Sequence, residues 1–223
     1  MNDINWGCAW SSMQSVLKFQ LSLSEKNKDE DISFYNLFIK YGKKDTLLDI
    51  FRKMNEKKDI TEALNILVNK NFAPYETDNG WAEPFISQLV LYDFGFEGEL
   101  ILINNYSNNN YAPELVFNRL LTFDEYKKLL KNHFAQKNPA PIIMDDSYVS
   151  ICIIGIKYNE ESKNIELIIM DPHVVDNPAN GLYIVVLNEQ GESLDVIPQH
   201  VLVSKGVFFN DNKPWMAYIP KTN

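Results

Sequence analysis

Apolar residues at helical spacing fill the first third of the chain. After Cys8 they recur at positions 9, 13, 16, 17 and 21, which predicts an amphipathic helix that begins at or just after Cys8. Three further helices are predicted, one through 34–38 with a stop near Gly42, and two around 47–54 and 63–68. Pro84 suits the first position of a fifth helix, because its missing N–H has no partner there, and Gly95 marks its end.

The pattern changes from helices to strands along the second half. A short strand is predicted at 100–103, and Thr122 with Glu125 has capping-box spacing for a helix through Leu130. From Pro139 onward, β-branched and aliphatic runs predict six strands, at 141–144, 148–157, 165–170, 182–187, 201–209 and 215–219. Helices first and strands afterwards indicate an α+β fold, and with no repeat or long linker we expect residues 1–223 to form a single domain.

Composition narrows the class of protein. The 223 residues are 45% hydrophobic and 23% charged, which excludes a disordered chain, and two cysteines are too few for a disulfide scaffold. A formal net charge of -9 argues against a protein that binds duplex nucleic acid. With no apolar run of about 18 residues and no signal-peptide pattern, we expect a soluble cytoplasmic protein whose thiols stay reduced.

Cys8 is the first candidate catalytic residue. It lies in Trp6-Gly7-Cys8-Ala9-Trp10, at the predicted start of a helix, where the partial positive charge of the helix stabilises the nucleophilic thiolate. Gly7 would let a substrate backbone approach the sulfur. The alternative is a buried structural cysteine, which is the commoner case. Cys152, inside an apolar strand, is predicted to be a core residue.

His173 is the second candidate, in Met170-Asp171-Pro172-His173 at the end of a predicted strand. Pro172 would end strand pairing, and the carboxylate and imidazole would share one side if the backbone stays extended. The alternative is that these residues form a simple turn. His133 and His200 are predicted to be surface residues, with His133 a cation at a helix C-terminus. Asp145 and Asp146 fit a turn better than a metal site.

Three motifs, in this order, resemble those of the ubiquitin-fold modifier-specific proteases (UfSP), which are papain-like cysteine peptidases. They are Trp6-Gly7-Cys8-Ala9 followed by Gln14, then Gly80-Trp81, then Asp171-Pro172-His173. The resemblance implies a papain-like fold, with the helical part packed on an antiparallel sheet. It also implies a peptidase that cleaves after the C-terminal glycine of a ubiquitin-like modifier and needs neither a metal nor an organic cofactor.

The same resemblance implies a role for each motif. Cys8 would be the nucleophile, His173 the general base and then general acid, and Asp171 the residue that holds the histidine. The residues implied to contact the substrate are Trp6, Gly7, Gly80 and Trp81, with Trp81 beside the channel for the glycine-terminated tail. The partner would be the modifier and its conjugates.

Two alternatives stay open. The first and third motifs are also similar to the autophagins, cysteine proteases that act on a lipid-conjugated modifier. The second alternative is a modifier-binding module with weakened catalysis. Asn5, Ser11 and Ile151 depart from the family pattern, and none of the seven residues before Cys8 is the tyrosine that the family uses to stabilise the oxyanion. Losing one such donor typically lowers the rate about 10²–10³-fold.

Overall fold

The computed structural model describes residues 7–24, 32–69, 84–103, 119–145, 149–172, 181–194 and 215–221. Six helices and seven strands are named in these ranges, and all seven strands belong to one sheet. The helices are α1 (Cys8–Leu23), α2 (Phe34–Tyr41), α3 (Lys44–Met54), α4 (Thr61–Asn69), α5 (Pro84–Asp93) and α6 (Phe123–Phe134). The strands are β1 (Gly98–Ile103), β2 (Arg119–Leu121), β3 (Ile142–Asp145), β4 (Ser150–Tyr158), β5 (Ile165–Met170), β6 (Leu182–Leu187) and β7 (Trp215–Pro220).

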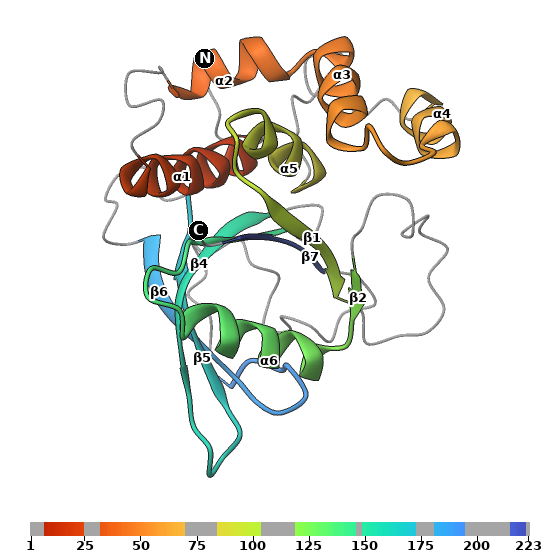
Figure 1. Ribbon diagram of the computed structural model, residues 1–223. Helices are drawn as coiled ribbons and strands as arrows, with labels where there is room; N and C mark the ends of the chain where they lie inside the picture. Colours follow the sequence, from red (N-terminus) through yellow and green to blue (C-terminus); the bar gives the residue numbers. More distant parts are fainter. Residues whose placement is uncertain are drawn as a thin grey trace.

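The sheet has the strand order β2-β1-β7-β3-β4-β5-β6. Neighbouring strands pair antiparallel except β1 and β2, which are parallel. Helices α1 and α5 pack on one face of this sheet, and α2 and α3 form an outer layer over them (Figure 1). Helix α6 covers the opposite face (Figure 1). The fold is therefore α+β, as the sequence predicts.

Two apolar cores lie on the two faces of the sheet, and the alternation of side chains along each strand divides residues between them. On β4, Cys152 belongs to the core under α1 and α5, whereas Ile151 and Ile153 belong to the core under α6. The apolar positions predicted for the first helix, among them Met13 and Leu17, are buried in the α1 core. Hydrophobic spacing thus correctly predicted the inward side of α1.

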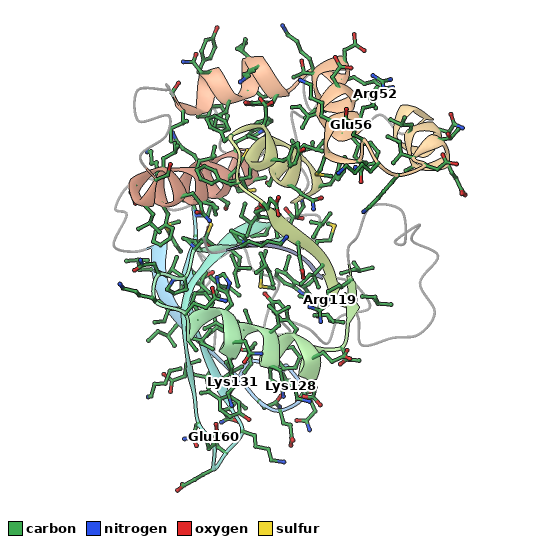
Figure 2. All side chains as sticks on the ribbon, in the orientation of Figure 1. Arg52, Glu56, Arg119, Lys128, Lys131 and Glu160 are labelled. Atoms are coloured by element: carbon green, nitrogen blue, oxygen red, sulfur yellow. The ribbon has the colours of Figure 1, made fainter. Side chains whose placement is uncertain are left out.

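Helix α6 begins with the capping box that the sequence predicts. The Thr122 side chain accepts a hydrogen bond from the backbone N–H of Glu125, and the Glu125 carboxylate accepts one from the N–H of Thr122. Farther along, Lys131 pairs with Glu160 in the turn between β4 and β5 at 2.9 Å (Figure 2). The ammonium also lies 3.9 Å from the ring centroid of Tyr158, so α6 is joined to the β4–β5 hairpin.

The predicted surface position of His133 is wrong. His133 is buried, and its Nε2 lies 2.7 Å from the carbonyl oxygen of Ala140. Because a carbonyl only accepts, Nε2 carries the proton and donates. Burial is the larger influence on this imidazole and lowers its pKa, while the hydrogen bond to Ala140 opposes the shift. His133 is therefore a neutral link between α6 and the segment leading into β3, rather than an exposed cation.

Several sequence predictions concern residues outside the described ranges. These are the turn at 79–81, the loop at 104–110 and the strand at 201–209. Strand β2 was not predicted, because three residues are too few to show a periodic pattern. None of the helices in the described part of the chain is both long and apolar enough to cross a membrane.

Candidate active site

Cys8 is the first residue of α1, and Gly7 is the helix N-cap. A glycine has no side chain to satisfy the first amide groups of a helix, and no side chain of the described residues caps this one. The carbonyl of Gly7 accepts a hydrogen bond from the N–H of Ser11 at 2.9 Å, which fixes the first turn. The uncapped start of α1 therefore directs its partial positive charge toward the sulfur of Cys8 and any anion beside it.

The second cysteine has a different environment. Both cysteines are buried: Cys152 completely, whereas Cys8 keeps 9% of its surface exposed and lies outside both core clusters. The Sγ of Cys152 donates a hydrogen bond to the carbonyl oxygen of Ser12 at 3.6 Å. Burial raises the pKa of the Cys152 thiol to about 12, although the hydrogen bond to Ser12 acts in the opposite direction. Cys152 is thus a core thiol, as predicted, and its contact with Ser12 seats α1 on β4.

Asp171 follows the last residue of β5 and is almost fully buried. Its backbone N–H donates to the carbonyl oxygen of Gly181 at 2.8 Å, which extends the pairing of β5 with β6 by one step. Burial is the main influence that raises the pKa of Tyr183, and the charge of Asp171 adds to it. The carboxylate therefore lies near the phenol of Tyr183, a residue of β6.

The contacts of Cys152 bring Cys8 and Asp171 to the same end of the sheet. Cys152 touches Ser12, one helical turn after Cys8, and it pairs across the ladder with Met170, which directly precedes Asp171. The other end of α1 lies far from there. Gln20, Leu23 and Ser24 line a cavity of about 570 Å³ together with residues that lead into β1 and β3. Cys8 thus lies where β4 begins and β5 ends.

Two other described cavities also lie at the far end of the sheet. One, of about 280 Å³, includes Gly98 and Lys221, and the other, of about 330 Å³, includes Pro220 and His133. These residues belong to the start of β1, the end of β7 and the end of α6. The far-end cavities are therefore separate from the surroundings of Cys8.

Strand β5 ends at Met170, and Pro172 lies in a turn. The expected side-by-side placement of the Asp171 carboxylate and the His173 imidazole involves a residue outside the described ranges and stays a prediction. A turn here takes the chain out of the ladder at the end of the sheet where α1 begins. His173, Trp6, Gly80 and Trp81 lie outside the described residues, as does His200, so their roles stay predictions.

One residue near this end of the sheet, Ser150, was missed from the sequence. Ser150 opens β4 and is fully buried, and its hydroxyl has no hydrogen-bond partner among the residues that the structure describes. It shares the α1 side of the strand with Cys152 by alternation. Ile151, which departs from the family pattern, packs in the core under α6 instead. Because side chains alternate between the two faces along a strand, the predicted strand already indicated that Ser150 and Ile151 lie on opposite faces of the sheet.

The sequence and the fold of the chain are similar to those of known proteins. Residues 99–193 match the sequence pattern of peptidase family C78, a stretch that contains Asp171 and His173 but not Cys8. No curated protein matches the sequence. Solved structures with a similar fold include the crystal structure of UfSP from C. elegans, with a TM-score of 0.55 and 12% sequence identity. That likeness covers 100% of this chain and 31% of the C. elegans chain, so the chain spans about a third of the length of that protein.

Both findings agree with the motifs. The family match covers the strands that lead to Asp171, and the shared fold extends over the helical part that carries Cys8. They confirm the resemblance to the ubiquitin-fold modifier-specific proteases: part of the chain is similar in sequence to peptidase family C78, and the chain shares a fold with UfSP from C. elegans.

Proposed function

We propose that the chain is a thiol-dependent peptidase that cleaves after the C-terminal glycine of a ubiquitin-like modifier of the ubiquitin-fold modifier type. The bond cleaved would be the peptide bond of a modifier precursor, the isopeptide bond of a conjugate, or both. One observation supports this proposal most directly. The start of α1 with Cys8 and the end of β5 with Asp171 lie at the same end of the sheet, linked through Cys152.

The proposed reaction has two steps. The Cys8 thiolate attacks the glycyl carbonyl, and His173 protonates the departing amine as the C–N bond breaks. A thioester between Cys8 and the modifier is left. His173 then takes a proton from water, which attacks the thioester carbonyl, and the proton passes to the sulfur or stays on the imidazole as the free modifier leaves. Asp171 holds the imidazole in the required tautomer and orientation.

One candidate donor for the oxyanion lies at the start of α1. The backbone N–H of Cys8 is at the uncapped start of α1, in the position from which helix N-termini stabilise negative charge. We expect it to donate to the oxyanion that forms on the glycyl carbonyl.

The test is incubation of the purified chain with precursors of several ubiquitin-like modifiers, each carrying extra residues after the terminal glycine. Intact-mass spectrometry should show release of the extension from the ubiquitin-fold modifier, and Cys8→Ala should bind that modifier without releasing anything. A lipid-conjugated modifier cleaved in its place would favour autophagin-like activity. Binding without cleavage by the unmutated chain would show a binding module and refute the peptidase.

A further inference from the structure

Exposed aliphatic side chains gather on one part of the sheet. Of the large hydrophobic residues that are exposed among the described residues, five lie on β4, β5, β6 and the segment returning beside β6. We call them the β4–β6 patch: Ile154, Ile168, Leu182, Ile184 and Leu194. Within β4, β5 and β6, Leu182 and Ile184 are the most exposed of these residues, at 51% and 55%. An apolar cluster of this kind on a soluble domain marks a surface that another molecule covers.

Strand register places the patch on a single face. Ile168 and Ile184 are direct cross-strand partners, and Leu182 shares their side of β6 because it lies two residues away. On β4, Gly155 pairs with Ile168 at a bulge, and a Cβ there would meet the Ile168 side chain at 3.2 Å. Because Gly155 has no side chain, the Ile168 side chain can lie over β4 in the direction of Ile154. This is the α1 face of the sheet, since Cys152 and Met170 point the same way.

Helix α1 does not cover this part of its face. Its contacts with the sheet are with β3 and β4, and β5 and β6 follow β4 toward the edge of the sheet. The ion pair between Lys157 and Glu166, at 3.1 Å, bounds the patch at the end remote from Cys8. Strand β6 itself, Leu182–Leu187, contains neither a charged residue nor a proline, the usual devices that keep edge strands from associating.

The patch is continuous with the candidate active site. Leu182 pairs with Met170, and the preceding Gly181 accepts the hydrogen bond from the N–H of Asp171. A protein bound on the patch would therefore have its nearest edge at the end of the sheet where α1 begins with Cys8. This neighbourhood favours a folded substrate over a second copy of the chain, because only the substrate must also reach the sulfur.

We propose that the β4–β6 patch is the docking surface for an apolar patch on the folded body of the ubiquitin-like modifier, whose C-terminal tail extends past Asp171 toward Cys8. This inference rests on the proposed function. A tail that ends in glycine offers little side chain to recognise, so specificity requires contacts with the folded body. The β4–β6 patch supplies apolar area for these contacts beside the site, where burial of a few aliphatic side chains can dominate affinity.

The experiment measures two quantities for each variant. Affinity for the mature modifier is measured in the Cys8→Ala background, where no turnover occurs. Reactivity of Cys8 is measured separately with a short tail peptide that ends in a glycyl electrophile and lacks the folded body. The patch variants are Ile184→Glu and Leu182→Glu, with Ile184→Val as the conservative change. Leu120→Glu is the matched control, because Leu120 is 61% exposed on β2 at the opposite edge of the sheet.

We expect Ile184→Glu and Leu182→Glu each to weaken modifier binding about 10-fold or more. Ile184→Val and Leu120→Glu should leave binding within about two-fold of the unmutated protein. Labelling by the tail peptide should be unchanged in every variant that retains Cys8, which also shows that the variants are folded. A loss of both binding and labelling in the glutamate variants but not in Ile184→Val would indicate misfolding and contradict a docking role.

Failure of this inference differs from failure of the proposed function. Modifier binding that is unaffected by Ile184→Glu and Leu182→Glu overturns the docking surface while leaving the peptidase in place. If those substitutions instead convert a dimer into a monomer with unchanged modifier affinity, the patch is a contact between copies and the inference is wrong. If no modifier binds or reacts with the unmutated chain, both the function and the docking surface are refuted.

Discussion

At the scale of single residues, the two cysteines differ in their position in the fold. Cys8 is the first residue of a helix and keeps 9% of its surface exposed, whereas Cys152 is fully buried where α1 packs on β4. The sequence correctly predicted that Cys152, between isoleucines on a strand, is a core residue, while the reactivity of Cys8 stays a prediction. The contact between Cys152 and Ser12 needed the structure, since the two residues are far apart in sequence.

Cys152 should resist alkylation in the native protein. Its pKa of about 12 leaves about one thiol in 10⁴ as thiolate at pH 8, and its burial excludes reagents. Incubation with iodoacetamide at pH 8, followed by peptide mass spectrometry, should modify Cys8 and leave Cys152 intact. In denaturant both should react. Equal modification of Cys152 in native and unfolded protein would show that α1 does not cover β4 as described.

His133 should make the fold less stable in acid. Burial lowers its pKa in the folded state, so below about pH 6.5 the unfolded chain binds a proton that the folded chain does not. Its share of the unfolding free energy therefore falls as the pH drops from 6.5 toward the folded pKa, by at most about 1.4 kcal/mol per pH unit.

Urea unfolding at pH 7.5, 6.5 and 5.5 measures this effect. The decrease toward pH 5.5 should be smaller in His133→Gln, which cannot take up the proton. An identical pH dependence in the two proteins would show that His133 does not cause the loss of stability in acid.

The buried position of His133 had a signal in the sequence, because Tyr126, Leu130 and His133 follow helical spacing on one side of α6. The nearby lysines suggested exposure instead.

At the scale of elements, caps and hydrophobic spacing predicted most helices closely. Gly42, Gly95 and the Thr122 capping box lie at the ends that they predicted. The sequence did not indicate which face of the sheet each helix covers. An amphipathic pattern shows that α6 has an apolar side. Which face of the sheet that side covers depends on how β3 and β7 pair, and those strands are 70 residues apart in sequence.

The start of β1 depends on a glycine. A Cβ at Gly98 would overlap ring atoms of Tyr218, which lies across the β1–β7 ladder and is fully buried. Gly98→Ala should therefore lower the unfolding free energy by about 1–3 kcal/mol through overpacking. Urea denaturation measures this directly.

Gly95→Ala is the matched control for this substitution. Gly95 has a φ of 81° and no atom near its added Cβ, so only backbone strain of about 1 kcal/mol is expected there. A double change of Gly98→Ala with Tyr218→Leu should lose less than the sum of the two single changes, because the smaller side chain removes the overlap. Strict additivity would contradict the close approach.

At the scale of the whole molecule, the fold places two segments that are distant in sequence at the same end of the sheet. Helix α1 and the end of β5 are separated by more than 140 residues, and both contact β4. Periodicity alone could not predict this meeting, since it carries no information about which strands become neighbours. The order of the three motifs indicated this proximity through the family resemblance. The structure places Cys8 and Asp171 at the same end of the sheet.

The most direct test of the central claim is covalent labelling of the full chain with the ubiquitin-fold modifier carrying an electrophile at its C-terminal glycine. We expect one modifier per chain on Cys8, none in Cys8→Ala, and labelling in His173→Ala and Asp171→Asn that is slower by about 10²-fold or more. An adduct on Cys152, or equally fast labelling in His173→Ala, would contradict the account.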